Sequence, residues 1–267
     1  MSRPPLARLR ARARELASSR ALRDFAAGLS DDPRVGAREV AGRCLRRAVA
    51  IDAEAERMAR LFALRDRLVR EGAHCVAGVD EVGVGPLAGP VVAAAVVLPA
   101  RPRLDGLDDS KKLTRKRREA LADAIHAQAI EIGIGEVSPS EIDALNIYRA
   151  ALEAMRRAVA ALPVGPDQLL VDARRIPGVA AEQTAIVGGD GKDASIAAAS
   201  IVAKVHRDAI MRRLDAEFPA YGFGAHKGYG TPQHLAALRR AGASPVHRRS
   251  FAPVAHVPVA RPPVSGR

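Results

Sequence analysis

The 267-residue chain is poor in aromatic residues and in cysteine. It has no tryptophan, and aromatic residues make up 3% of the chain, which excludes a base-stacking platform of the kind that single-strand-binding proteins use. The two cysteines, Cys44 and Cys75, supply neither a metal-ligand cluster nor a disulfide framework, as is typical of the reducing cytoplasm. The longest apolar run, residues 91–100, is too short to span a bilayer, and the N-terminus has no apolar signal core. We therefore expect a cytoplasmic protein without a membrane anchor.

Acidic residues are outnumbered by basic ones. The chain has 42 Lys and Arg against 30 Asp and Glu, a formal net charge of +12. This balance favours a polyanionic partner, most simply nucleic acid; an arginine-rich proteome is the alternative explanation. Residues 1–71 contain no lysine, and residues 1–70 hold 17 Arg against 9 Asp and Glu. This segment therefore carries +8 of the charge.

Residues 1–71 are predicted to form a helical extension. Apolar residues such as Leu61, Leu64 and Leu68 recur at helical spacing, and the sequence Asp31-Asp32-Pro33 interrupts the pattern. This predicts two or three amphipathic helices. Two roles remain open for them: a basic arm that adds affinity for a duplex, or a structural cap whose arginine face is solvated.

From Cys75 onward the pattern becomes that of an α/β protein. Strands are expected at residues 75–82, 90–98, 130–137, 168–172 and 184–187. Helices are expected at residues 114–129, 138–162 with a break near Asn146, 194–217, and from Thr231-Pro232 onward, with Thr114 and Asp193 as N-caps. Three successive strands, followed by strands that alternate with helices, predict a mixed five-stranded sheet flanked by helices over residues 72–253. Residues 254–267 are rich in Val, Ala and Pro and are predicted to be a disordered tail.

The segment AHCVAGVDEVGVGPLAGPVVAAAVVLP, residues 73–99, carries the clearest chemical signal. Asp80 and Glu81 lie at the end of an apolar run. Neighbouring side chains of a strand point to opposite faces, so both can approach one site only where the strand ends, near Val82-Gly83. Strand, acidic pair, flexible loop and strand is an order that suits a nuclease holding metal ions beside a nucleic-acid backbone.

The loop after the acidic pair formally fits the dinucleotide fingerprint G-x-G-x-x-A. That fingerprint requires a helix after the loop, and Pro86 with Gly89-Pro90 prevents one. The nicotinamide-dependent oxidoreductase that the fingerprint would indicate is therefore disfavoured. We expect instead that Gly83 and Gly85 let the backbone come close to a sugar-phosphate.

Two further aspartates end short apolar runs, Asp172 in LLVD and Asp190 in AIVGGD. Taken singly, each could be a turn former or a helix cap. Four carboxylates gathered at one sheet edge would repel one another unless cations neutralise them. Oxygen-only ligands select Mg²⁺ or Mn²⁺. Asp80, Glu81, Asp172 and Asp190 are therefore the candidate metal ligands.

Basic residues that could serve phosphates occur in two segments. DDSKKL contains Ser110, Lys111 and Lys112, and HKGYGT contains Lys227 and Tyr229. A solvated loop is the alternative interpretation of both segments.

Together these segments resemble the ribonuclease HII family over roughly residues 73–253. The matching segments, in order, are GVDEVGVGPLAGPVVAAAVVL, DSKKLT, EIDALNIYRA, LLVD, GGD, SIAAASIVAKVHRD, YGFGAHKGYGT and HRRSFAP. The helical extension also resembles one found in some family members. The resemblance implies a monomer with a ribonuclease H-like fold that cuts RNA–DNA hybrids, and duplex DNA with embedded ribonucleotides, on the 5′ side of the ribonucleotide. The products would carry 3′-hydroxyl and 5′-phosphate ends.

The resemblance also implies roles for the candidate residues. The four carboxylates would hold two metal ions, Mg²⁺ or Mn²⁺, for two-metal hydrolysis. Tyr229 would pack on the sugar beside the ribonucleotide, and Lys111 or Lys112 would contact phosphate.

Three residues depart from the family pattern. Val84 replaces the arginine of Gly-Arg-Gly, Ala173 replaces a glycine, and Gly188 replaces a lysine. A lost charge-assisted contact is worth roughly 1.5–3 kcal/mol, so we predict a weakened preference for single embedded ribonucleotides and specificity closer to that of ribonuclease HIII. A hybrid-binding protein with little catalysis is a further alternative, which the presence of all four carboxylates disfavours.

Overall fold

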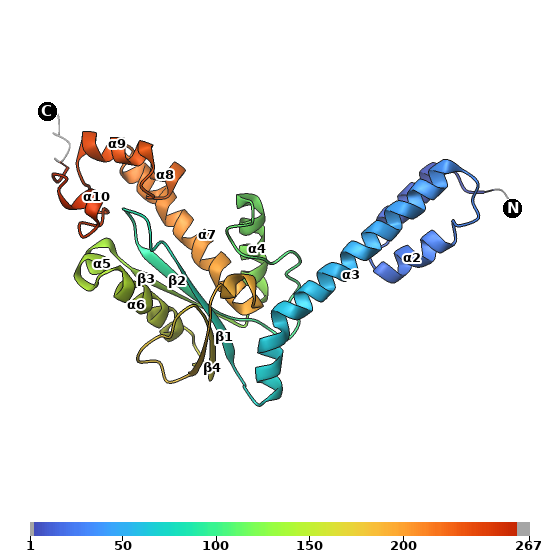
Figure 1. Ribbon diagram of the computed structural model, residues 1–267, viewed down its shortest axis with the longest axis horizontal. Coiled ribbons are helices and arrows are strands. Elements are labelled where there is room, and N and C mark those ends of the chain that lie inside the picture. The colour runs from blue at the N-terminus through green and yellow to red at the C-terminus, as the bar shows by residue number, and fades with distance from the viewer. Residues whose placement is uncertain (1–2, 261–267) are drawn as a thin grey trace. The chain divides into compact units, whose positions relative to one another are not determined.

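The computed structural model describes residues 3–260, which form two compact units that divide between Arg60 and Leu61 (Figure 1). The helices are α1 (Leu6–Glu15), α2 (Ser19–Ala27), α3 (Val35–Arg70), α4 (Arg115–Gln128), α5 (Pro139–Leu145), α6 (Ile147–Ala160), the 3₁₀ turn η1 (Gly189–Gly191), α7 (Ala194–Glu217), α8 (Phe223–His226), α9 (Pro232–Ala241) and α10 (Ala252–Ala255). The strands are β1 (Val76–Val82), β2 (Val91–Val97), β3 (Glu131–Val137), β4 (Gln168–Asp172) and β5 (Glu182–Ile186). None of the helices within residues 3–260 is both long and apolar enough to cross a membrane.

The first unit consists of α1, α2 and the first part of α3. These helices share an apolar core that includes Leu9, Leu22 and Val40. The predicted break lies between α2 and α3, where the Asp32 carboxylate accepts hydrogen bonds from the backbone and the guanidinium of Arg34. The amphipathic pattern therefore predicted these helices correctly.

The boundary between the units lies inside α3. The sequence placed it after residue 71, whereas the compact units divide at Arg60. The reason is that Leu64 and Leu68, in the last turns of α3, pack against Val76 of β1 and Ile196 of α7. The end of the long helix thus belongs to the core of the second unit.

The second unit is built on a mixed five-stranded sheet, which confirms the predicted fold class. The strand order is β3-β2-β1-β4-β5. β1 pairs antiparallel with β2 and parallel with β4, while β2–β3 is antiparallel and β4–β5 is parallel. The carboxyl ends of the neighbouring strands β1 and β4 therefore lie side by side, at the edge of the sheet where the candidate carboxylates are found.

Helices cover both faces of this sheet (Figure 1). Alternate residues of β1, Ala77 and Val79, face an apolar core shared with α6. Gly78 faces the other side, where α7 approaches so closely that a Cβ at this position would lie 2.0 Å from the carbonyl carbon of Ser195. The alanine-rich sequence of α7 allows this approach, which brings α7 against the strand that carries Asp80.

The predicted helix signals appear as expected. The side chains of Thr114, Asp193 and Thr231 accept backbone hydrogen bonds at the starts of α4, α7 and α9. Asn146 has a φ of 70° and separates α5 from α6, which confirms the predicted break.

A buried histidine pair joins α9 to the segment that follows it. Nδ1 of His234 lies 2.9 Å from the carbonyl oxygen of Tyr229, so this nitrogen donates. Nδ1 of His247 accepts from the backbone N–H of Ser244, so Nε2 of His247 donates to Nε2 of His234 across 3.1 Å. Both rings are therefore neutral. Burial lowers the pKa of His247 to about 4, and it also lowers that of His234.

The predicted disorder of residues 254–267 does not hold for the described residues 254–260. Val254 is fully buried, and the backbone of Ala243 bonds to Pro258 and Ala260. Contact with the end of α9 thus orders this segment. Residues 261–267 lie outside the described part of the chain.

Replacing Gly78 with alanine should strongly destabilise the second unit. The added methyl group would meet the backbone of α7, which cannot move without separating α7 from the sheet, so we expect a loss of about 3 kcal/mol in the free energy of unfolding. Urea denaturation measures this loss. Gly165→Ala is the control, because no atom lies within 4 Å of a Cβ there, and a comparable loss in that variant would contradict the explanation.

The histidine pair should make the protein less stable in acid. An unfolded imidazole binds its proton near pH 6.5, whereas folded His247 binds it near pH 4. The unfolded state therefore binds more protons between these values, so this contribution is complete above pH 6.5 and falls as the pH drops towards 4, by at most about 3 kcal/mol. Unfolding free energies of the wild type and His247→Asn at several pH values test this. Equal pH slopes for the two proteins would contradict it.

Candidate active site

The four candidate carboxylates come from three neighbouring segments. Asp80 and Glu81 lie near the end of β1, Asp172 is the last residue of β4, and Asp190 lies in η1. The backbone N–H of Gly189 donates to Oδ1 of Asp172 at 2.7 Å, which fixes η1 against the end of β4. The parallel pairing of β1 with β4 thus brings together residues that are far apart in sequence.

Asp80 is the most buried of the four, with 5% of its surface exposed. Burial raises its pKa well above the usual range, and the charges of Glu81 and Asp172 raise it further. A hydrogen bond from Ser200 of α7 partly offsets this rise. The sequence analysis did not identify Ser200, because in the sequence it is one small residue within an apolar helix.

Glu81 and Asp80 have different neighbours. Oε1 of Glu81 lies 4.0 Å from Nη2 of Arg174. Burial raises the pKa of Glu81, whereas the positive charge of Arg174 lowers it. The negative charge of Asp172 raises the pKa of both Asp80 and Glu81. The carboxylate at the end of β4 is therefore coupled electrostatically to the two on β1.

Lys111 is the cation bound most directly to this cluster. Its Nζ lies 2.9 Å from Oδ2 of Asp190. The pKa of Lys111 is raised, first by the hydrogen bond from its ammonium to Asp190. The structure therefore places Lys111 at the acidic cluster, and its contact with phosphate stays a prediction.

The donor set fits a hard divalent cation. All its charged oxygens are carboxylates, and their mutual repulsion is the condition that bound cations relieve. Within residues 3–260, no group of three or more Asp, Glu, His or Cys side chains is arranged as a ready metal site. Binding a cation between these carboxylates would therefore require their side chains to adjust.

Two buried arginines hold the glycine-rich loop, and the sequence analysis assigned neither a role. Arg248 donates to the carbonyl oxygens of Gly83, Val84 and Gly89. Arg207 donates to those of Pro90, Ala88 and Lys227. Both are fully buried and bond to backbone carbonyls instead of carboxylates. Burial lowers their pKa values, to about 10 for Arg207 and about 9 for Arg248.

Gly83 must be glycine for this arrangement. Its φ is +90°, and a Cβ there would lie 2.2 Å from Nε of Arg207. The loop that was predicted to be flexible is thus a fixed turn, whose backbone carbonyl groups accept hydrogen bonds from two guanidinium groups. A basic residue in a helix or a loop is usually solvated, so the segments VHRD and HRRSF gave no sign of this role.

The second predicted loop lies against the first. The backbone N–H of Leu87 donates to the carbonyl oxygen of Gly228 at 2.8 Å. Tyr229 is 44% exposed, and a Cβ at Gly85 would lie 3.6 Å from its ring. Lys227 has a φ of 53° and its ammonium bonds to the carbonyl oxygen of Gly224. The structure therefore places the loop of residues 83–85 beside the loop of Lys227 and Tyr229, and their contact with a substrate stays a prediction.

Ser110 and Lys112 are placed differently. Ser110 is buried, and its hydroxyl lies 2.9 Å from that of Ser200. It therefore supports α7 beneath Asp80. The Nζ of Lys112 lies 3.2 Å from Asp108, on a different carboxylate from those of the site.

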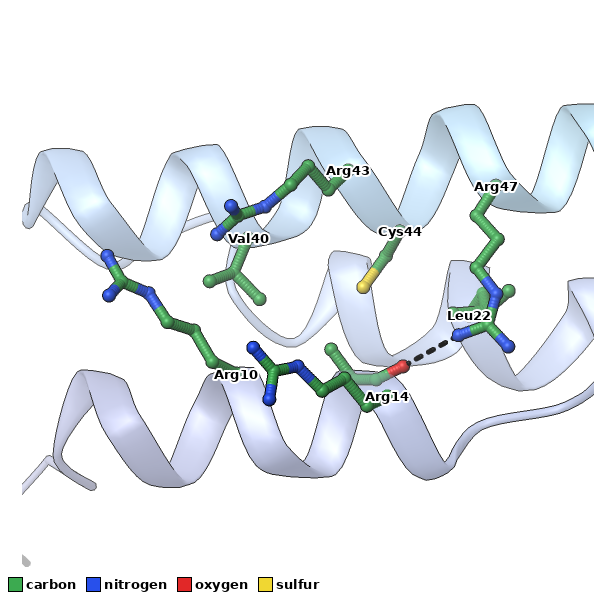
Figure 2. A pocket seen from close by; sticks show the side chains of 8 residues that line it. Arg10, Arg14, Leu22, Val40, Arg43, Cys44 and Arg47 are labelled. Atoms are coloured by element: carbon green, nitrogen blue, oxygen red, sulfur yellow. Dashed lines mark hydrogen bonds between the residues drawn. The ribbon is translucent and has the colours of Figure 1, made fainter.

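The first unit has a separate arginine-lined pocket of about 220 Å³. Figure 2 shows Arg10 and Arg14 on one helix facing Arg43 and Arg47 on another, around Leu22, Val40 and Cys44. Arg47 donates to the carbonyl oxygen of Ala13. The apolar core of this unit agrees with a structural cap, and the arginine-lined surface agrees with a basic arm; its binding to a duplex stays a prediction.

Comparison with known proteins gives consistent matches. The family model for ribonuclease HII matches residues 77–254. The ribonuclease HII of Myxococcus xanthus is 52% identical over 239 residues, which cover 88% of this chain and 82% of that protein. That of Desulfitobacterium hafniense strain Y51 is 50% identical, covering 86% and 89%.

Two solved structures share the fold. Ribonuclease H2 of Pyrococcus horikoshii matches with a TM-score of 0.58 and 29% identity over 68% of this chain and 95% of that one. Ribonuclease HII of Archaeoglobus fulgidus, in its complex with PCNA, matches with a TM-score of 0.54 and 31% identity over 62% and 87%.

Replacing Arg248 with methionine should destabilise the loop. Three buried carbonyl groups would lose their donor, so we expect a loss of about 3 kcal/mol or more in unfolding free energy, measured by urea denaturation. Arg248→Lys should lose less, because one ammonium replaces part of the hydrogen bonding. Exposed Arg239 provides the control, and an equal effect of Arg239→Met would contradict the role of Arg248.

Proposed function

Because the chain belongs to the ribonuclease HII family, and is therefore a ribonuclease H endonuclease, we propose that it cuts RNA–DNA hybrids and ribonucleotides embedded in duplex DNA. Cleavage occurs on the 5′ side of the ribonucleotide and leaves 3′-hydroxyl and 5′-phosphate ends. One observation carries the proposal: four carboxylates converge beside a rigid glycine loop, with Tyr229 exposed against that loop. A phosphate could contact the carboxylate side of this site through bound cations, and the adjoining ribose could contact the loop and Tyr229.

Asp80, Glu81, Asp172 and Asp190 are the proposed ligands of Mg²⁺ or Mn²⁺, with two ions in the site. When bound, the ions supply Lewis-acid chemistry that activates water and stabilises the departing 3′-oxygen. The chain itself contributes a buried, repulsive carboxylate set, and Ser200 orients Asp80 within it. Lys111 is bonded to Asp190, and its side chain is 79% exposed, so a phosphate can approach its ammonium from solvent.

The loop residues are proposed to recognise the ribonucleotide. The backbone of Gly83, Val84 and Gly85 is held from behind by Arg207 and Arg248, so its amide groups keep a fixed orientation towards a ribose 2′-hydroxyl. Tyr229 packs on the neighbouring sugar. Lys111, Lys112 and Lys227 add affinity for the backbone without sequence preference.

The proposal is tested on two duplexes, one with a single ribonucleotide and one an RNA–DNA hybrid, each with Mg²⁺ and with Mn²⁺. We expect the wild type to cut both, and Asp80→Asn to lose at least about 10³-fold in rate while it still binds, because removal of a ligand charge leaves the recognition loop intact. Binding by the wild type without cleavage of either duplex would instead support a non-catalytic hybrid-binding protein.

Val84 determines the ratio of the two activities in this proposal. It lacks the charged fork of an arginine, so Val84→Arg should raise cleavage of the single ribonucleotide relative to the hybrid by about 10-fold. Val84→Leu is the control for side-chain size. An unchanged ratio in Val84→Arg would contradict this role for position 84.

A further inference from the structure

Arg174 lies beside the carboxylate cluster with an unused donor. It follows Asp172 by two residues, after a turn at Ala173 whose φ is +55°. Its Nη2 lies 4.0 Å from Oε1 of Glu81, the outer limit of an ion pair. Its Nη1 is buried and has no hydrogen-bond partner among the described residues.

The ring of Tyr148 holds this side chain in place. The Cζ atom of Arg174 lies 5.2 Å from the ring centroid, a cation–π distance. Tyr148 is 59% exposed, unusually open for a large side chain on a helix that otherwise packs against the sheet. The pair therefore keeps a planar guanidinium beside Glu81 at the rim of the site.

A buried guanidinium N–H without a partner costs about 1–3 kcal/mol. A guanidinium fork matches the two non-bridging oxygens of a phosphate, which can accept from both of its terminal nitrogens. When such a group enters, a turn of the guanidinium brings the buried N–H to it and relieves the loss. Glu81, by contrast, lies too far away for a short hydrogen bond.

We propose that Arg174 binds the phosphodiester that enters the carboxylate cluster, and that Tyr148 is the positioning residue that orients it. The proposal rests on the proposed function and adds a phosphate-binding residue to it. Every substrate presents this phosphate, whether its RNA part is one nucleotide or many. Arg174 therefore acts equally on both substrate classes, unlike Val84.

Arg174→Ala tests this on the full chain with the two duplexes described above. We expect kcat/KM to fall 10- to 100-fold for both duplexes by the same factor, mainly through KM. Binding of the uncleaved hybrid in EDTA should weaken, and its dependence on log salt concentration should become shallower by about one unit, as for the loss of one phosphate contact.

Neighbouring and conservative variants provide the controls. Arg175 is exposed, and Arg175→Ala removes the same charge from the next position. This variant should keep KM within twofold of the wild type and leave the salt slope unchanged. Tyr148→Phe should retain wild-type behaviour because the ring remains, whereas Tyr148→Ala should raise KM in the same direction as Arg174→Ala.

Two outcomes would overturn the assignment. One is an Arg174→Ala protein that matches Arg175→Ala in KM and salt slope. The other is a protein that loses thermal stability without any change in binding, which would make Arg174 a structural residue. Failure of the proposed function is distinct, because the wild type itself would then cut neither duplex.

Discussion

Arg207 and Arg248 hold the glycine-rich loop through its carbonyl oxygens, and the loop half of the site depends on that contact. Leu87 and Ala88 anchor the loop in the apolar core, while its carbonyl groups take their donors from α7 and from the segment after α9. The same hydrogen bonds join it to the loop of Lys227. Guanidinium groups suit this task, because one fork serves several carbonyls and stays charged even when burial lowers its pKa.

The carboxylate half of the site depends on close packing between α7 and β1. Gly78 allows the helix to approach, and that approach places Ser200 beside Asp80. Ser110 closes the same region from the other side through its contact with Ser200. The acidic groups are therefore held where little water reaches them. Their charged forms are unfavourable there until cations or a cationic side chain approach.

The carboxylate cluster has a cation on each of two sides. Lys111 adjoins Asp190 on one side, and Arg174 adjoins Glu81 on the other. Lys111 is exposed and paired with a carboxylate, whereas the guanidinium of Arg174 lies over the ring of Tyr148. The two cations are therefore held by different contacts, one by an ion pair and the other by an aromatic ring.

The sequence by itself determined the secondary structure, the mixed sheet and the four candidate carboxylates. These follow from local rules: apolar periodicity, caps such as Thr114 and Thr231, and acidic residues at strand ends. Only the tertiary structure decided that Arg207 and Arg248 hold the glycine-rich loop, that Arg174 lies beside Glu81 while Arg175 stays exposed, that Ser110 points inward, and that the domain boundary lies inside α3. The reason is that each of these depends on a partner distant in sequence, and a charged or small residue looks the same in sequence whether packing buries it or leaves it in water.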